Sequence, residues 1–443
     1  MREGEERLLM IKKLNSKQET FQDDFLNLIS VSEPDQAKIS QIVKQIIEEV
    51  KLNGDFAVAE YSRKFDGNSF SGVKQISLDD DMKQRILRAG SKDQILAMEN
   101  AHDRIRQYHA HQKIDPYSYT DSNGSHFSMR VLPLEKVGIY VPGGKAAYPS
   151  SVMMNAVPAS VAGVNEIVMV VPSINGEINE LVLAAAAISG VDKIFNIGGA
   201  QAIAALAFGT RSVPRVDKIV GPGNAYVAEA KRQVFGSVGI DMVAGPSEIL
   251  IIADESANPE WVTMDLFSQA EHDELARAIL ISPSDDLIDQ VDKCIPNMLP
   301  RMSRVEIIRE SLNRNGALVK VKDMDEACAL ANQIAPEHLE LAVKNPSELI
   351  SKIKNAGSIF AGKFSSEALG DYCAGPNHVL PTSGSARFSS GLSVFDFLKR
   401  TSVINVSKEG AAELGPIAAT LARGETLTAH ALAAELRFKK WEV

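Results

Sequence analysis

The sequence predicts an α/β protein with two parallel-sheet domains, an N-terminal helical segment and a small C-terminal tail. From Val137 onward, short β-branched runs alternate with helical stretches, which indicates parallel strands joined by crossover helices. Glycine-rich turns follow several of the strand-like runs, as is typical of Rossmann-like domains. We find no repeat of roughly 20–50 residues that would indicate a solenoid.

The N-terminal region is predicted to be mainly helical. Residues 35–115 carry apolar side chains at three- and four-residue spacing, the period of an amphipathic helix. The stretch "DPYSYTDSNGSHFSMRVLP" is more typical of a polar turn region followed by a short strand. We expect residues 1–136 to form one region that packs on the second α/β unit.

The alternating part of the chain divides into two blocks. Residues 137–243 contain strand-like runs such as "EIVMVVP" and "KIFNIGG", and we expect them to form a Rossmann-like, nucleotide-binding-like domain. Residues 244–385 begin with "SEILIIAD" and are predicted to form a second Rossmann-like domain for substrate and metal. After Gly384 the pattern breaks up, so residues 386–443 are predicted to be a tail that closes with the helix "ETLTAHALAAELRFKK".

Composition narrows the class of protein. With 45% hydrophobic and 23% charged residues over 443 positions, the chain resembles ordinary globular proteins and is long enough for a multi-domain enzyme. Its 47 basic and 57 acidic residues leave a net charge of −10, which argues against non-specific nucleic-acid binding. The three cysteines are far apart and form no CxxC pair, which favours a reducing compartment. No signal-like or bilayer-length apolar run is present, so we expect a cytoplasmic protein with no membrane partner.

Three glycine-rich turns predict a ligand crevice. They are "YVPGG", "NIGGAQ" and "VGPGNAY", each after a strand-like run of the first block. Such turns let the backbone approach a ligand, and the helix that follows favours an anionic phosphate at its N-terminus. An α/β protein also needs glycine at such turns for conformational reasons alone. Three of them in one sheet nevertheless favour a binding site.

Several stretches hold candidate metal ligands. Gln269 and His272 in "SQAEHDELA" are three residues apart on an expected helix and so share a face, although a solvated polar helix end explains that stretch as well. Asp371 lies in "GDYCAGPNHVLP", where it is a plausible oxygen ligand and Cys373 is better explained as a structural thiol. His430 stands alone among alanines and leucines, a setting typical of a core or interface histidine.

The stretch "IAPEHLEL" combines a carboxylate and an imidazole after a proline. Proline suits the first position of a helix, so Glu337 and His338 are expected in a first helical turn. The helix dipole would stabilise the Glu337 carboxylate and would keep His338 neutral near pH 7, while Glu337 itself pulls toward imidazolium. An acidic first turn with an incidental histidine is the simpler alternative. Two bases side by side suit a reaction with more than one proton transfer.

Together these motifs resemble the histidinol dehydrogenase family. The similarity extends from about residue 140 to residue 438 and includes "GIYVPGG", "VGPGNAYVAEAKRQVFG", "SQAEHD", "IAPEHLEL", "GDYCAGPNHVLPTSG" and "ETLTAHA". The resemblance implies oxidation of L-histidinol to L-histidine, the final step of histidine biosynthesis, in two NAD-dependent steps through a bound aldehyde. It also implies one zinc ion per subunit and a homodimer in which the C-terminal tail reaches into the partner's site.

The same resemblance assigns roles to individual residues. Glu337 and His338 would be the acid–base pair. The zinc ligands would be Gln269, His272, Asp371 and His430. Substrate contacts would come from these four residues together with Ser247, His338 and Glu425. The dinucleotide would meet Tyr140, Gln201 and Asn224. Because Glu425 and His430 lie in the tail, they would serve the neighbouring subunit.

Three other functions remain compatible with these residues. A related NAD-dependent dehydrogenase could use the same zinc and Glu–His pair on another small alcohol or polyol. A metal-dependent hydrolase or aldolase could use the same ligands and acid–base pair without a dinucleotide. A zinc-stabilised scaffold would need none of the acid–base chemistry.

Overall fold

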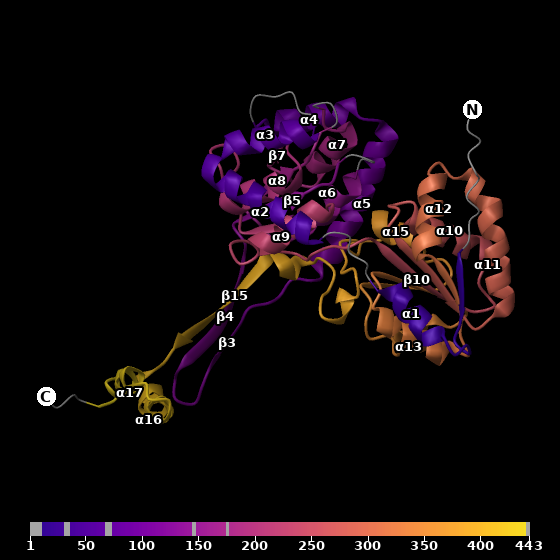
Figure 1. The fold of residues 1–443 in the computed structure, drawn as a ribbon. Helices are drawn as coiled ribbons and strands as arrows, with labels where there is room; N and C mark the ends of the chain where they lie inside the picture. Colours follow the sequence, from indigo (N-terminus) through magenta and orange to yellow (C-terminus); the bar gives the residue numbers. More distant parts are fainter. Residues whose placement is uncertain (1–10, 31–35, 67–72, 144–147, 174–176, 440–443) are drawn as a thin grey trace.

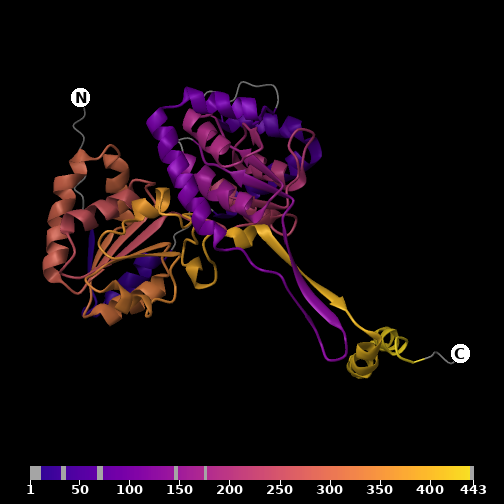
Figure 2. The ribbon, with the colours of Figure 1, turned by 180° about the vertical axis from the view of Figure 1, so that it is seen from behind.

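The computed structural model describes residues 11–30, 36–66, 73–143, 148–173 and 177–439. Two α/β units lie side by side, and a long arm projects from them and ends in two helices near the C-terminus (Figure 1, Figure 2). The predicted fold class is therefore confirmed. Within the described residues, no helix is both long and apolar enough to cross a bilayer.

The first unit is built on a six-stranded sheet in the order β2-β7-β6-β5-β8-β9. Its strands are parallel except β2, which pairs antiparallel with β7. The chain passes from β5 to β6 and β7 and then crosses back to β8 on the other side of β5, so the strand order reverses between β5 and β8. The strands are β2 Gln75–Ser77, β5 Lys136–Tyr140, β6 Glu166–Val170, β7 Lys193–Phe195, β8 Lys218–Val220 and β9 Gly239–Ile240.

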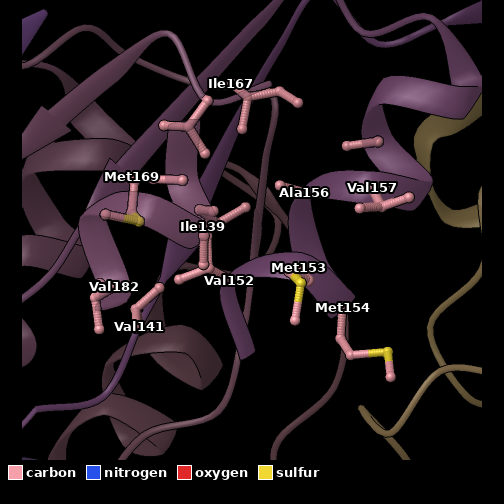
Figure 3. Close-up of a cluster of buried hydrophobic side chains, with 14 of the residues drawn as sticks. Ile139, Val141, Val152, Met153, Met154, Ala156, Val157, Ile167, Met169 and Val182 are labelled. Atoms are coloured by element: carbon pink, nitrogen blue, oxygen red, sulfur yellow. The ribbon is translucent and has the colours of Figure 1, made fainter. Parts of the chain in front are cut away.

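Helices cover both faces of this sheet. Ile139, Val152 and Met169 belong to the buried cluster between β5, β6 and helices α6 and α7 (Figure 3). Pro158 lies inside α6 without ending it. The covering helices are α6 Pro149–Ala162, α7 Glu180–Ile188, α8 Gly199–Phe208 and α9 Ala225–Val234.

Helices α2 to α5 pack on this first unit, not on the second as we expected; of the N-terminal helices in the described residues, α1 (Phe21–Ile29) packs on the second unit. Helix α2 packs against α8 and α9, α4 against α7, and α5 against α6. The apolar face of α2, with Val43, Ile46 and Val50, is buried in the same cluster as the alanine-rich helix α8. The N-terminal helices on this unit are α2 Gln36–Asn53, α3 Asp55–Asp66, α4 Asp80–Ala89 and α5 Lys92–Ala110.

The second unit has a six-stranded, fully parallel sheet in the order β1-β12-β11-β10-β13-β14. The start of the chain joins this sheet, because β1 pairs with β12 and α1 (Phe21–Ile29) buries Phe25 in its core. The strands are β1 Lys12–Asn15, β10 Glu248–Ala253, β11 Arg277–Ser282, β12 Ala317–Lys320, β13 His338–Ala342 and β14 Ser358–Ala361. The other helices are α10 Pro259–Ala270, α11 Asp285–Met298, α12 Val305–Asn315, α13 Met324–Ile334, α14 Pro346–Ile350 and α15 Glu367–Tyr372.

The expected helix at "IAPEHLEL" is wrong. Helix α13 ends at Ile334, Ala335 adopts a left-handed conformation with φ 52°, and after Pro336 the chain enters strand β13 at His338. The proline therefore follows a helix end, a position it favours because it cannot continue the helix. Its neighbours Glu337 and His338 consequently lie at the entrance of a buried central strand, between β10 and β14.

The arm is an antiparallel sheet in the order β15-β4-β3, made from strands far apart in sequence. Beyond it, helices α16 and α17 pack on each other at the tip (Figure 1). The sequence predicted a helix at 425–440, but the structure also holds β15 and α16 in the stretch where the pattern breaks up. The elements are β3 Tyr117–Thr120, β4 His126–Pro133, β15 Leu398–Asn405, α16 Lys408–Gly424 and α17 Thr428–Glu435.

Candidate active site

Most of the predicted site residues of the second unit gather at the amino edge of its sheet. Strands β10 and β13 are neighbours whose first residues are Glu248 and His338, and Ile249 is the register partner of His338. Helix α10 runs back to this edge and ends next to Gln269 and His272, and α15 brings Asp371 there. The site therefore lies at the opposite edge from the carboxyl-end crevice that is usual in open α/β sheets.

The loop after α15 joins this edge to the first unit. Arg104 on α5 donates from Nε to the carbonyl of Cys373 at 2.8 Å, and Asn377 donates from Nδ2 to the carbonyl of Met154 at 2.6 Å. Cys373 packs against the apolar cluster of the first unit, which agrees with its predicted structural role. Asp371 consequently sits at the boundary between the two units.

His338 is buried and held among acceptors. Its Nδ1 lies 3.0 Å from the carbonyl oxygen of Glu248 and 3.3 Å from Oε1 of Glu367. Because a backbone carbonyl oxygen can only accept, the contact with Glu248 places a proton on Nδ1. On the other side of the ring, Nε2 lies 3.5 Å from Oδ1 of Asp371 and has no hydrogen-bond partner among the described residues. A lone pair on Nε2 of the neutral ring would be the group available for chemistry.

The electrostatic surroundings of His338 differ from those we expected. Burial lowers the pKa of His338, but the carboxylates of Glu367, Glu337 and Asp371 raise it, and the net pKa lies well above its ordinary value. The expected helix start, which would have kept the ring neutral, does not exist here. Carboxylates alone therefore favour imidazolium, and a neutral ring requires added positive charge nearby.

Glu337 is buried beside His338. Its Oε2 accepts a hydrogen bond from the backbone N–H of Glu248 at 2.9 Å, across the β10–β13 pair. Burial raises the pKa of Glu337 to about 8, and the charges of Glu248 and Asp371 add to the rise while His338 opposes it. A carboxyl group whose pKa lies near neutrality is suited to proton transfer.

Three buried carboxyl groups near this pair were not predicted from the sequence. Glu248, Glu340 and Glu367 are 3%, 3% and 2% exposed, respectively. The sequence signal for Glu248 and Glu340 was an acidic residue at the start of, or inside, an otherwise apolar strand, as in "SEILIIAD" and "HLELA". The signal for Glu367 was its position four residues before Asp371, on the same face of a helix. Burial raises the pKa of Glu367 to about 8 and also raises the pKa of Glu248.

The three predicted metal ligands of the second unit converge. Burial raises the pKa of Asp371, but His338, whose Nε2 lies 3.5 Å from its Oδ1, and the neighbouring His272 lower that pKa, and the net pKa lies below its ordinary value. Gln269 is fully buried, and its amide is best oriented with the nitrogen facing Oε1 of Glu367 at 2.8 Å, the carbonyl of Glu248 at 3.2 Å and Nδ1 of His338 at 3.2 Å. Its two N–H groups can donate to the two oxygens, so Nδ1 need not accept from it. In that orientation the amide oxygen points away from these acceptors. His272 is exposed at the end of α10.

The geometry also groups His338 with metal-ligating side chains. One ligand atom from each of His338, Glu367 and Asp371 lies within 4.8 Å of the others. Nε2 of His338 and Oε2 of Glu367 are buried and lack hydrogen-bond partners in the described part of the chain. Two unsatisfied buried donors or acceptors at one point are costly, so this position fits a cation with mixed nitrogen and oxygen ligands.

Ser247 and His378 complete the rim. Ser247 precedes β10, and its carbonyl accepts the N–H of Arg277. His378, noted in the sequence only as part of a crowded loop, contacts the carbonyl of Asp371 through Nδ1 at 3.0 Å. Burial lowers the pKa of His378, so this second imidazole favours the neutral form.

Glu425 and His430 are not brought to this edge within one chain. Glu425 caps the C-terminus of α16 and His430 lies on α17, both exposed at the tip of the arm (Figure 1, Figure 2).

The predicted cofactor residues lie at the carboxyl edge of the first sheet. Tyr140 ends β5, is 3% exposed, and its hydroxyl accepts the N–H of Gly199 at 3.1 Å. Gln201 on α8 is fully buried, and neither atom of its amide has a partner within the described ranges. Asn224 caps α9 by accepting the N–H groups of Tyr226 and Val227. Of the three glycine turns, Gly144 falls outside the described residues.

Comparison with known proteins identifies the family of the chain. Residues 30–438 match the family model for histidinol dehydrogenase. A histidinol dehydrogenase of Dechloromonas aromatica is 56% identical over 432 residues, which cover 98% of this chain and 100% of the relative. A histidinol dehydrogenase of Pseudomonas aeruginosa is 55% identical over 427 residues, which cover 96% of this chain and 97% of the relative.

A solved structure shares the fold. The crystal structure of histidinol dehydrogenase from Elizabethkingia anophelis is 35% identical and superposes with a TM-score of 0.89, covering 96% of this chain and 98% of that one. Since both the family model and the relatives span nearly the whole chain, this protein belongs to the histidinol dehydrogenase family.

Proposed function

We propose that this protein oxidises L-histidinol to L-histidine in two successive NAD-dependent steps with the intermediate aldehyde kept bound, the final reaction of histidine biosynthesis. The observation that carries the proposal is the buried Glu337–His338 pair, set beside Asp371 and Gln269 at one sheet edge. The relatives are named histidinol dehydrogenases, so family membership supports histidinol as the substrate.

We assign proton removal to His338. With Nδ1 donating to the Glu248 carbonyl, the lone pair on Nε2 accepts the proton of the substrate hydroxyl as hydride leaves the adjacent carbon. The same atom serves the second oxidation, in which it takes a proton from the hydrated aldehyde. Each step consumes one NAD⁺ and yields one NADH and one proton.

We assign activation of water to Glu337. Hydration of the aldehyde between the two oxidations needs a base that removes a proton from water, and Glu337 lies beside His338 with its Oε2 3.7 Å from Nδ1. Burial raises the pKa of Glu337 to about 8, so as a carboxylate it is a stronger base than an exposed glutamate.

The proposed zinc ligands are Gln269, His272 and Asp371, completed by His430. Of these residues, Asp371 lies within 4.8 Å of ligand atoms of His338 and Glu367, whose buried Nε2 and Oε2 lack partners among the described residues. A cation with nitrogen and oxygen ligands fits this edge, so we propose one zinc ion per subunit. When bound, zinc would hold the substrate through its imidazole and amine, and its positive charge would oppose the carboxylates that raise the pKa of His338. Ser247 and Glu425 would add polar contacts to the substrate.

We propose that NAD binds at the turns after β5, β7 and β8. The turns after β5 and β8 flank the point where the strand order reverses, the usual place for a nucleotide in such a sheet, and the Gly199 N–H after β7 donates to the hydroxyl of Tyr140 at the end of β5. The orphaned amide of Gln201 and the hydroxyl of Tyr140 are the polar groups of these turns, and Asn224 opens helix α9. The dinucleotide supplies the hydride acceptor, and these residues position it.

The proposed assembly is a homodimer that exchanges arms. The residues His430 and Glu425 lie on an arm whose exposed apolar side chains include Leu421, Leu427 and Leu432. An arm that reaches a second copy would bury this surface and deliver both residues to the partner's site. We further propose a cytoplasmic location.

The proposal is tested with a substrate panel. Purified protein loaded with zinc should reduce NAD⁺ with histidinol and should be at least about a hundredfold less efficient with small polyols that lack an imidazole, because the polar site would be left unpaired. Removal of the metal with a chelator should abolish the activity, and added zinc should restore it. Comparable turnover of a polyol would instead favour a related alcohol dehydrogenase.

A further inference from the structure

The ends of β5 and β8 approach each other unusually closely. Gly221, directly after β8, has φ 112°, and a Cβ atom at this position would lie 2.1 Å from the carbonyl oxygen of Tyr140. Only glycine tolerates both the conformation and the contact. Gly221 is therefore the point where the two halves of the sheet meet, three residues before Asn224.

Two buried charged side chains form hydrogen bonds with the backbone N–H and carbonyl groups of Gly221. Lys231 on α9 donates from Nζ to the carbonyl oxygen of Gly221 at 2.8 Å. Asp241, just after β9, accepts the N–H of Gly221 through Oδ2 at 2.8 Å. Lys231 and Asp241 also form an ion pair with each other, and their side chains are 2% and 1% exposed.

A buried ion pair such as this one contributes little net free energy to the stability of a fold. Desolvating two charges offsets most of their attraction, and apolar replacements of buried pairs are often neutral or stabilising. Both charges here direct a hydrogen bond at the same glycine, and each such bond to a charged group is stronger than a neutral one. What the pair specifies is thus the conformation of one turn.

The turn at Gly221 leads directly to Asn224, one of the predicted cofactor-binding residues. Asn224 accepts the N–H groups of Tyr226 and Val227 and so begins α9, the helix that also carries Lys231. A Cβ at Gly223 would lie 2.4 Å from Val227, so this part of the turn is also tightly packed. A shift of Gly221 would displace Asn224 and the start of α9 together.

We propose that Lys231 and Asp241 are positioning residues for the dinucleotide, which act by locking the Gly221 turn at the junction of β5 and β8. The inference rests on the proposed function, because it takes NAD as the ligand of this edge. Neither side chain reaches the surface, so neither is assigned a contact with the cofactor itself.

The experiment compares the wild-type protein with the double variant Lys231→Met/Asp241→Asn. The double variant removes both charges, so it leaves no unpaired ion, and asparagine still accepts the N–H of Gly221. We expect hydrogen exchange of the metal-loaded, cofactor-free protein to accelerate across residues 218–226. Calorimetric titration should show NAD⁺ binding roughly tenfold more weakly, while zinc content and histidinol affinity stay unchanged.

The matched control is Lys218→Met on the same strand β8. Lys218 donates to the carbonyl and carboxylate of Asp396, away from the turn, so this variant loses an ion pair without touching Gly221. It should bind NAD⁺ as the wild type does. If the double variant fails to retain zinc and histidinol, the variant Lys231→Gln/Asp241→Asn, which also leaves no unpaired charge, takes its place with the same expectations.

The outcomes separate the two proposals. Wild-type protein that does not bind NAD⁺ refutes the proposed function. Wild-type binding together with unchanged affinity in the turn variant overturns the positioning role, and so does weaker binding without faster exchange at 218–226. An equal loss in Lys218→Met would show that any ion pair of this sheet has the same effect, which also contradicts the inference.

Discussion

At the scale of single residues, the environment of His338 explains why one imidazole suits this site. The backbone carbonyl of Glu248 orients the ring, and Asp371 lies on its opposite side. Glu337 has a hydrogen bond of its own to the N–H of Glu248, so both side chains are anchored to the same residue of β10. Anchoring of this kind keeps catalytic groups in place at little entropic cost during turnover.

The first prediction concerns His338→Asn. Asparagine can still donate to the Glu248 carbonyl but cannot accept a proton, so we expect kcat for both oxidations to fall by about 10²–10⁴. Zinc content, measured by elemental analysis, should stay at one ion per subunit. Since His338 also lies among possible metal ligands, loss of zinc in this variant would make it a ligand and sink the assignment as base.

The second prediction concerns Glu337→Gln. Glutamine preserves the hydrogen bond from the Glu248 N–H but cannot activate water. We therefore expect conversion of the aldehyde to the acid to slow by at least about tenfold more than oxidation of the alcohol. The two half-reactions are measured separately, by supplying histidinol or the aldehyde in single-turnover experiments. An equal loss in both would remove the special role in hydration.

At the scale of elements, three segments have to meet to form the site. Glu340 on β13 accepts the N–H of Glu367 at the start of α15 at 2.7 Å. Glu340 also shares a hydrogen bond with Asp265 on α10, one turn before Gln269. This carboxyl pair ties β13, α10 and α15 together behind the catalytic residues. Such a bond between two carboxyl groups needs one shared proton.

The third prediction is a pH dependence of that connection. Burial raises the pKa of Asp265 to about 6, although its hydrogen bond with Glu340 opposes the rise. The groups that face it are Glu340, whose own pKa is raised by burial and by the charges of Asp265 and Glu367, and Lys363, which lines the same small pocket. The folded protein thus binds a proton at Asp265 that the unfolded chain releases near pH 4.

The sign of the effect follows from linkage. Between the unfolded pKa near 4 and the folded pKa of about 6, rising pH removes stability, because the folded state holds the extra proton. In Asp265→Asn this pH-dependent loss of stability disappears, so the variant should gain roughly 2–3 kcal/mol relative to wild type between pH 4 and 7. Urea unfolding of both metal-free proteins measures it. A constant difference across this range would contradict the shared proton.

The elements show where sequence reasoning succeeds. Alternation of β-branched and helical stretches predicted most strands of both sheets, because parallel strands buried on both faces are continuous apolar runs. It failed at Pro336, since a proline after a helix end and a proline at a helix start look alike in one sequence. It also missed β15, because an exposed strand on an arm has no core to impose apolar alternation.

The site was predictable only in part for a similar reason. Gln269, His272 and Asp371 stood out through the motifs around them, and the structure brings them to one edge. Glu248 and Glu340 were missed because a single acidic residue in an apolar strand gives no spacing pattern. Their contacts depend on strand register and on α15 lying across β13, which are tertiary features.

At the scale of the whole molecule, the arm is the feature that a single chain does not explain. Strands β3 and β15 are exposed along nearly their whole length, and α16 and α17 at the tip pack on each other, far from the two α/β units (Figure 2). His430 and Glu425 are carried there, away from the residues with which we group them. A site shared between subunits accounts for both observations.

The fourth prediction uses mixed dimers. Inactive His338→Asn and His430→Asn proteins, mixed in equal amounts and allowed to exchange subunits, should recover about 25% of wild-type activity. Half of the dimers would be mixed, and each of these would contain one site with a normal body and a normal arm. The matched control mixes His338→Asn with His272→Asn, whose defects both lie in the body. It should recover nothing. No recovery in the test pair, after subunit exchange has been verified by mass spectrometry, would exclude a shared site.

The most direct test of the central claim is the ratio of NADH formed to histidinol consumed. Zinc-loaded protein is given limiting histidinol and excess NAD⁺, and NADH absorbance and histidine are measured together at completion. The account predicts two NADH for each histidine and no free aldehyde trapped by an added amine reagent. One NADH per histidinol with release of the aldehyde would contradict it.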